Sequence, residues 1–342
     1  MSRNKKDIIK YGLVILLSIL VVASVIVPLP YYIEVPGSAE NVRDFVSVDD
    51  KRNKNDGSFM LTTVGIRRGT LASLITAKFL PFQDVISQQD LMGDSTDEEY
   101  DKLTKLQMTS SENMAKKVAL ELAGEPYKFA FKGVYVMNVS DTSDFKGKLE
   151  TGDIVTKVDN QTFESAKEFM DYVKSKKVGD VVTVTYERDG QEAEAKGKLM
   201  TLKVKDEEDR PGIGITLTDS TELQTDRDVV IHTEDIGGPS AGLMFTLELY
   251  DLLSGKDLRK GREIAGTGTI NEDGSVGSIG GIDKKVVAAD SEGATIFFAP
   301  NEPIEGSQTN YEEAVEAAKK IDTKMKIVPV KTVQDALNYL EK

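Results

Sequence analysis

The feature that most constrains this chain is a long uncharged apolar run near its N-terminus. The run covers residues 11–29, YGLVILLSILVVASVIVPL, which are nineteen residues without an acidic or basic side chain. A helix of that length rises roughly 28 Å at about 1.5 Å per residue, close to the hydrocarbon core of a bilayer. A cleaved signal peptide is the alternative, but its apolar part is usually only about 7 to 15 residues long. No clear A-x-A cleavage site follows, so the sequence favours a membrane-spanning helix.

A basic segment precedes the apolar run and predicts its orientation. Its positive charges are Arg3, Lys5, Lys6 and Lys10. Because basic flanks stay in the cytoplasm, we expect residues 1–30 to form a cytoplasmic tail and one transmembrane helix in contact with membrane lipid. No second run of similar length follows. We therefore expect a single-pass protein of the cell membrane whose remaining chain is extracellular.

Composition excludes several classes of protein. The 342 residues carry 43 Lys and Arg against 57 Asp and Glu, a net charge of -14. This balance argues against nucleic acid as a partner, because phosphate binding needs a basic surface. The chain has no cysteine, which excludes disulfides and thiolate sites, and its one histidine, His232, cannot build a zinc site of several histidines. We expect neither a metal nor another cofactor.

Residues 31–130 give mixed signals. Within them, residues 57–66, GSFMLTTVGI, predict a strand, and residues 94–122 predict a polar helix with irregularly spaced apolar positions. The acidic cluster at residues 97–99 is interpreted as a solvated face. We assign no chemistry to this extracytoplasmic lead-in segment and expect it, at most, to pack on the C-terminal domain.

Residues 131–203 predict a small β-rich domain. Residues 133–139, GVYVMNV, alternate like a strand, and residues 149–163, LETGDIVTKVDNQTF, contain a turn, a strand and a second turn. An amphipathic helix at 165–180 and a hairpin with a DG turn follow. This arrangement resembles a PDZ domain of the type found in bacterial proteases.

The PDZ resemblance implies a peptide-binding site. In such domains a peptide adds as a strand to an exposed sheet edge, and backbone N–H groups of a loop bind its terminal carboxylate. We place that loop at Phe131, Lys132, Gly133 and Val134. A small sheet that only packs against its neighbour is the alternative.

A charged linker containing a proline, KVKDEEDRPG at residues 203–212, predicts a domain boundary. Beyond it, predicted strands alternate with helices across residues 211–342, which indicates an α/β or α+β domain. The predicted fold class is therefore α+β and multidomain, with a transmembrane helix, a β-rich PDZ-like domain and a C-terminal α/β domain.

The turn GGPSAG, residues 237–242, places Ser240 directly before the apolar run LMFTLELYDLL. A serine there can simply cap the helix by binding a free backbone N–H. It can instead be a nucleophile, which requires a nearby base. The candidate bases are His232 in VVIHT and the pair Lys284 and Lys285 in GGIDKKVVAAD, where burial would lower the pKa of an ammonium. Helical geometry does not choose between the two lysines, which point about 100° apart.

Four strings decide the interpretation of this turn: GGPSAGLMFTLELYDLL, LRKGREIAGTGTI, DGSVGSIGGIDKKVVAA and ATIFFAP. In this order they closely resemble the proteolytic domain of the Lon protease family. The resemblance implies a Ser-Lys dyad with Ser240 as the nucleophile, Lys285 as the base and Thr267 as the residue that orients the lysine. The supporting glycines, expected to let the substrate backbone approach closely, are Gly237, Gly238 and Gly242.

The sequence departs from the family pattern at one position. The family often has an acidic residue three positions before the serine, where this chain has Gly237. Glu234 and Asp235 are the nearest substitutes, and the role of a carboxylate stays open.

The complete layout resembles the membrane-anchored, PDZ-carrying Lon-like proteases of Gram-positive bacteria. The resemblance implies an ATP-independent endopeptidase that cleaves extracytoplasmic peptides or proteins through an acyl-enzyme, with a PDZ-like domain that recruits substrate or gates the site. It also allows a homo-oligomeric ring. A catalytically silent extracytoplasmic PDZ scaffold is the alternative. A nucleotide-binding domain is disfavoured, because Asn271 stands where a dinucleotide fingerprint needs glycine and no G-x-x-x-x-G-K-[ST] occurs.

Overall fold

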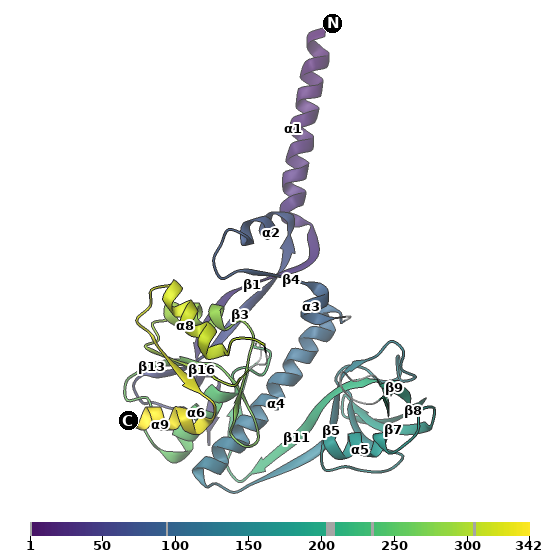
Figure 1. Cartoon of the computed structure of the whole chain (residues 1–342), viewed down its shortest axis with the longest axis vertical. Coiled ribbons are helices and arrows are strands. Elements are labelled where there is room, and N and C mark those ends of the chain that lie inside the picture. Colours follow the sequence, from purple (N-terminus) through teal and green to yellow (C-terminus); the bar gives the residue numbers. More distant parts are fainter. Residues whose placement is uncertain (1, 94, 203–208, 234–235, 304–305) are drawn as a thin grey trace.

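The computed structural model describes residues 2–93, 95–202, 209–233, 236–303 and 306–342. Its first element, helix α1 (Ser2–Ile26), projects away from the rest of the chain (Figure 1). Within it, Ile8–Ile26 is long and apolar enough to cross a membrane, and none of this stretch is fully buried. The predicted helix is confirmed, but it ends at Ile26 because Pro28 begins a strand.

A six-stranded sheet with the order β17-β16-β13-β3-β1-β4 forms the centre of the C-terminal domain (Figure 1). Its strands are β1 (Pro28–Asn41), β3 (Ser58–Thr70), β4 (Asp84–Ser87), β13 (Glu263–Gly266), β16 (Ile296–Pro300) and β17 (Lys326–Val330). Strands β3, β13, β16 and β17 are parallel, and β1 and β4 are antiparallel to their neighbours. The lead-in segment therefore does more than pack on this domain, because three of the six strands belong to it.

Helices cover both faces of this sheet. They are α6 (Gly242–Ser254), α7 (Ile282–Ser291), α8 (Asn310–Lys320) and α9 (Val333–Glu341). Two consecutive residues of β16 show the two faces, as successive strand residues point to opposite sides. Phe298 packs in one core with Phe245 of α6, and Phe297 packs in another with Val286 of α7. The arrangement is a three-layer α/β/α domain.

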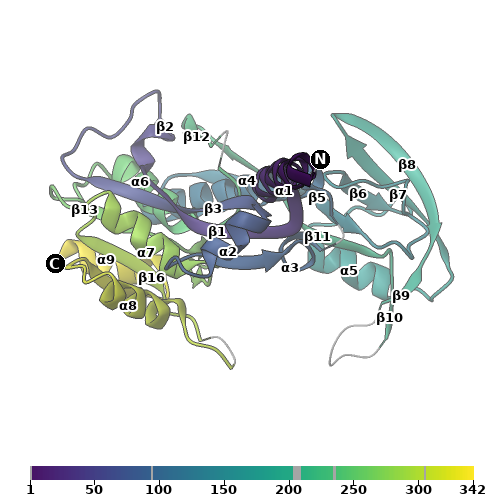
Figure 2. The same ribbon diagram turned by 90° about the horizontal axis from the view of Figure 1, so that it is seen from above.

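Helix α4 (Asp97–Ala123) lies between this domain and the five-stranded sheet (Figures 1 and 2). It begins with a capping box at Thr96 and ends at Gly124 in the left-handed conformation. It contacts α6 on one side and strands of the second sheet on the other. The short elements nearby are η1 (Val42–Asp44), β2 (Val46–Val48), α2 (Leu71–Ala77), α3 (Gln88–Met92), β12 (Val229–Ile231), β14 (Thr269–Ile270) and β15 (Val276–Gly277).

The second sheet has the order β11-β5-β6-β7-β8 and carries helix α5 (Ala166–Lys174). Its strands are β5 (Tyr127–Val139), β6 (Ile154–Val158), β7 (Val181–Arg188), β8 (Gln191–Lys198) and β11 (Ile215–Thr225), with a separate pair β9 (Met200–Leu202) and β10 (Arg210–Gly212). The predicted DG turn is confirmed at Asp189 and Gly190, which both have positive φ.

The expected carboxylate-binding loop is not a loop in the structure. Phe131, Lys132, Gly133 and Val134 lie inside β5, which pairs with β11 on one side and β6 on the other. Gly133 has a φ of +150° at an irregularity of the ladder, and a Cβ there would meet the carbonyl oxygen of Val155 at 2.3 Å. The glycine thus marks an irregularity in an inner strand of the sheet and not a loop.

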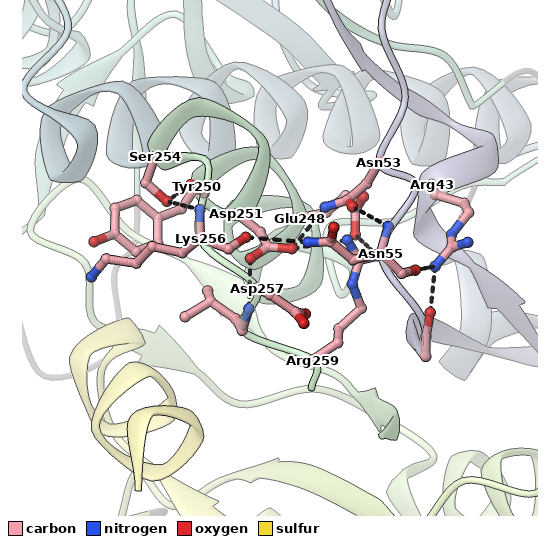
Figure 3. A network of polar contacts seen from close by, with 12 residues as sticks. Arg43, Asn53, Asn55, Glu248, Tyr250, Asp251, Ser254, Lys256, Asp257 and Arg259 are labelled. Carbon is pink, nitrogen blue, oxygen red and sulfur yellow. Dashed lines mark hydrogen bonds and ion pairs between the residues drawn. The ribbon is translucent and has the colours of Figure 1, made fainter. Parts of the chain in front are cut away.

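A buried charged network ties the loop after β2 to α6 (Figure 3). The fully buried guanidinium of Arg259 donates to Glu248 at 3.1 Å and to Asp251 at 2.8 Å. Asn53 donates to the same Asp251 carboxylate at 2.7 Å. Because a buried charge is tolerated only with partners, this network holds the C-terminal half of α6, which carries Glu248 and Asp251, in place.

Candidate active site

A pocket of about 690 Å³ lies where the six-stranded sheet, the turn before α6 and helix α4 meet. Its walls include Glu34 of β1, Thr62 of β3, Thr104 of α4, and the two residues Ser240 and Lys285. The fold therefore brings the predicted serine and lysine into one pocket although they are 45 residues apart in the chain.

The hydroxyl of Ser240 points to the lysine and does not cap a helix. Helix α6 has Ala241 at its N-cap position, and no side chain caps it. The structural interpretation of this serine as an N-cap is therefore wrong. Its Oγ lies 2.6 Å from Nζ of Lys285.

Lys285 sits in the first half of α7 and is only 3% exposed. Burial lowers the pKa of its ammonium from the usual 10.5 to about 7, and the negative charge of Glu34 opposes the change. A substantial fraction of this side chain is therefore the neutral amine near pH 7, the form that can accept a proton.

Thr267, which follows β13, is hydrogen-bonded to both Lys285 and Ser240. Nζ of Lys285 donates to Thr267 Oγ1 at 3.0 Å, and Oγ1 donates to the carbonyl oxygen of Ser240 at 3.0 Å. Thr267 is fully buried. Its hydroxyl thus holds the amine and the serine backbone in one arrangement.

Comparison with known proteins gives a family for each of the two domains. Residues 98–199 match the family described as PDZ domain, and residues 216–341 match the Lon protease (S16) C-terminal proteolytic domain. The chain contains a PDZ domain and a Lon proteolytic domain. The PDZ match includes most of α4, which the structure packs on both domains.

Curated relatives of the Lon domain are Lon proteases. That of the Aster yellows witches'-broom phytoplasma is 29% identical over 103 residues, which are 30% of this chain and 12% of the relative. That of Trichlorobacter lovleyi is 33% identical over 106 residues, 31% of this chain and 12% of the relative. The chain thus spans about 12% of the length of these relatives. Among solved structures, the PDZ domain of an SdrC-like protein from Listeria monocytogenes is 42% identical, covers 26% of this chain and 92% of its own, and has a TM-score of 0.24.

Lys284 and Lys285 are both buried but face different partners. Lys284 contacts Asp84 and also lies 3.2 Å from Asp283 and 3.6 Å from Glu34. Burial acts to lower the pKa of Lys284, but the hydrogen bond with Asp84 and the charge of Asp283 outweigh it, so that the pKa is raised. Lys284 is therefore held as a cation away from Ser240, and Lys285 alone of the pair contacts the serine.

The three glycines of the turn have different structural reasons. Gly238 has a φ of +86°, which only glycine adopts readily. A Cβ on Gly237 would meet Thr104 Oγ1 at 2.8 Å, and one on Gly242 would meet Ile270 Cγ2 at 2.7 Å. These two glycines were expected to let the substrate backbone approach closely. In the structure, Gly237 and Gly242 instead leave room for side chains of the protein itself.

The remaining sequence candidates are not in the pocket or cannot be placed. His232 is exposed and is not among the residues that line the pocket, and its backbone N–H donates to Phe45. Lys285 occupies the position beside Ser240 that a histidine base would need. Glu234 and Asp235 lie outside the described residues.

Sequence reasoning missed the contributions of α4 and β1 to the site. The N–H of Gly238 donates to the carbonyl oxygen of Thr104 at 2.8 Å, and Ser111 Oγ donates to that of Pro239 at 3.0 Å. Glu34 faces the pocket from a strand far from either motif in the chain. No local motif marks these residues. The sequence predicted a helix over 94–122, but its apolar positions are irregularly spaced and did not indicate which surface it packs on.

Proposed function

We propose that this protein is an ATP-independent serine endopeptidase in which Ser240 is the nucleophile and Lys285 the general base. The observation that carries the proposal is the 2.6 Å separation of Ser240 Oγ and Lys285 Nζ in one pocket, with the buried Thr267 hydroxyl bound to the same Nζ. The Lon domain match at residues 216–341 supports the same reaction class.

In the proposed reaction, Lys285 is the base for both the acylation and the deacylation step. Neutral Lys285 accepts the hydroxyl proton while Ser240 Oγ attacks a peptide carbonyl, and the resulting ammonium then protonates the leaving amine. The developing oxyanion lies at the start of α6, where backbone N–H groups and the positive helix end favour negative charge. Such donors are worth about 3 to 4 kcal/mol each. Water, deprotonated by Lys285, hydrolyses the acyl-enzyme.

Thr267 is proposed as the positioning residue of the dyad. Its Oγ1 has Lys285 Nζ as a donor and the Ser240 carbonyl as an acceptor, so it aims the amine at Oγ. Gly238 N–H is bound to Thr104 and Gly242 N–H to Pro239, which itself has no N–H. The proposed oxyanion donors are therefore the N–H groups of Ser240 and Ala241.

The PDZ domain is proposed to recruit substrate or to gate the pocket. Strand β11 is an edge of its sheet, and Ala166 N–H at the start of α5 donates to Asp219 of this strand at 3.1 Å. An extended peptide can add to this edge. Helix α4 leads directly from the pocket wall at Thr104 into β5, so a change at the PDZ domain can reach the catalytic turn.

We further propose that α1 anchors the protein in the cell membrane with the N-terminus in the cytoplasm and the two domains outside. The apolar window Ile8–Ile26 and the basic residues before it support this orientation. The family resemblance supports three further parts of the proposal. They are a homo-oligomeric ring, an origin in Gram-positive bacteria, and peptide or protein substrates outside the cytoplasm.

Cleavage of an unstructured protein tests the proposed activity. The full chain in detergent, without ATP, is expected to degrade casein, whereas Ser240→Ala and Lys285→Ala lower kcat by at least about 10³-fold. His232→Ala is the control and is expected to keep the wild-type rate. Equal cleavage by wild type and Ser240→Ala would contradict the dyad. A wild type that neither cleaves casein nor is labelled at Ser240 by a serine-reactive phosphonate would favour the silent PDZ scaffold.

A further inference from the structure

An apolar patch lies at the base of α1. It is formed by α2 and the turn that follows it, and its members are exposed apolar side chains: Leu71, Ile75, Phe79 and Leu80. Phe79 is 82% exposed, the highest value among the large hydrophobic side chains that the structure describes. Isolated apolar side chains are normal on a surface, but a group of four on one short segment needs an explanation.

The position of α2 relative to α1 indicates what covers this patch. Helix α2 and strand β3 contact α1 (Figure 1). Along residues 8–26, every side chain is exposed except Ala23 and Ser24, which are half-buried. Ala23 lies three residues before the end of the span at Ile26, or about 4.5 Å at 1.5 Å per residue. A segment that packs at Ala23 therefore lies at the depth where the span leaves the hydrocarbon.

The flanking charges fit the same location. Arg67 before α2 and Lys78 after it are exposed, and the sequence from Leu71 to Phe82 has no acidic residue. Apolar and aromatic side chains with flanking cations are the composition of segments that lie in the headgroup region of a bilayer.

We propose that α2 and the turn through Leu80 are seated in the outer interface of the same bilayer that α1 crosses. This inference rests on the proposed membrane anchoring by α1 and adds a second point of attachment. Two attachments fix the tilt of the Lon domain, which a single flexible tether would leave free. Strand β1 then holds the pocket at a fixed distance from the membrane surface. Glu34 of the pocket follows Pro28, at the start of β1, by six residues, which is about 20 Å of strand. Segments of other proteins close to the membrane are thus the substrates within reach.

Tryptophan fluorescence tests the seating directly, since the chain contains no tryptophan. Phe79→Trp and Ile75→Trp each place a probe on the patch, Ile75 on α2 and Phe79 on the turn after it. Val181→Trp is the matched control, because Val181 is also an exposed apolar residue (62%) but starts β7 in the PDZ domain, far from α1 (Figures 1 and 2). The full chain is reconstituted in phosphatidylcholine–phosphatidylglycerol vesicles with or without brominated acyl chains.

The two patch probes are expected to lose emission at least about twofold in brominated vesicles, while the Val181→Trp probe is unchanged. Vesicle flotation is measured in parallel for each variant. Floating protein whose patch probes are not quenched would overturn this inference and leave the anchoring by α1 in place. Protein that does not float would overturn both. Patch emission that responds to protein density in the vesicles and not to bromine would mean that a second copy covers the patch, which also overturns the proposal.

Discussion

Lys285→Met is expected to make the protein more stable while it removes the proposed base. The wild-type ammonium has a pKa of 10.5 in an unfolded chain and about 7 in the folded pocket. At about 1.36 kcal/mol for each pKa unit, this decrease corresponds to about 5 kcal/mol. Below pH 7, Lys285 is protonated in the unfolded chain, whereas the folded pocket disfavours its ammonium, so this residue lowers the free energy of unfolding by the whole amount. Methionine cannot be protonated and therefore removes this cost.

The stability gain from Lys285→Met is expected to depend on pH. Because the folded pKa is the lower one, the cost of Lys285 is absent above about pH 10.5, grows as the pH falls and is complete below about 7. For a lysine with these two values the cost is about 1 kcal/mol at pH 9.5 and about 4 to 5 kcal/mol at pH 6.5. Loss of the hydrogen bond to Thr267 offsets about 1 kcal/mol. The net gain from methionine is therefore about 3 to 4 kcal/mol at pH 6.5 and close to zero at pH 9.5.

Urea unfolding of the full chain in detergent, followed by circular dichroism, measures this difference. Both proteins carry Ser240→Ala, so that self-digestion does not interfere. Lys284→Met in the same background is the matched control. The raised pKa of Lys284 means that its ion pairs add stability below pH 10.5, so this variant is expected to be less stable at both pH values. A gain from Lys285→Met that is the same at pH 6.5 and 9.5, or a loss at pH 6.5, would refute the reasoning.

Three further predictions concern the dyad and its support. The wild-type kcat/KM for a flexible peptide is expected to rise with pH through about 7 and then level off, because the neutral amine of Lys285 is the active form; a stopped assay from pH 5.5 to 9 measures it, and a fall across that range would exclude this base. Thr267→Val is expected to lower kcat by about 10- to 100-fold with little change in KM, since the amine loses its orienting partner; an unchanged kcat would remove Thr267 from the site. Arg259→Met is expected to cost about 3 to 5 kcal/mol in urea unfolding, because Glu248 and Asp251 are left without their buried cation (Figure 3); a cost below about 1 kcal/mol would show that the network contributes little.

Local signals were sufficient for most elements and for the residues at the centre of the site. The apolar run, the strand at 57–66 and the helix after GGPSAG all appear near the predicted residues, because their hydrophobic periodicity is strong. The placement of Lys285 beside Ser240 agrees with the family alignment, which chose a lysine where helical geometry could not.

Contacts between distant parts of the chain could not be predicted from the sequence. Nothing local indicates that β3 pairs with β13, since the pairing depends on the whole fold. The same limit hid Glu34 and Thr104, whose roles arise only when β1 and α4 close the pocket. At Gly133 the error has a different cause, because a glycine that allows a strand irregularity cannot be told from a loop glycine by sequence.

The pairing of β3 with β13 also sets an order of events during synthesis. Ser58 and Glu263 face each other in this ladder although 205 residues separate them, and the whole PDZ domain lies between. Contacts of such long sequence separation form late, whereas the PDZ sheet closes within its own stretch of chain. A growing polypeptide would thus fold its PDZ domain before β13 exists. The nucleophile and its base come together only after most of the chain has emerged, so an incomplete translation product carries no assembled catalytic pocket.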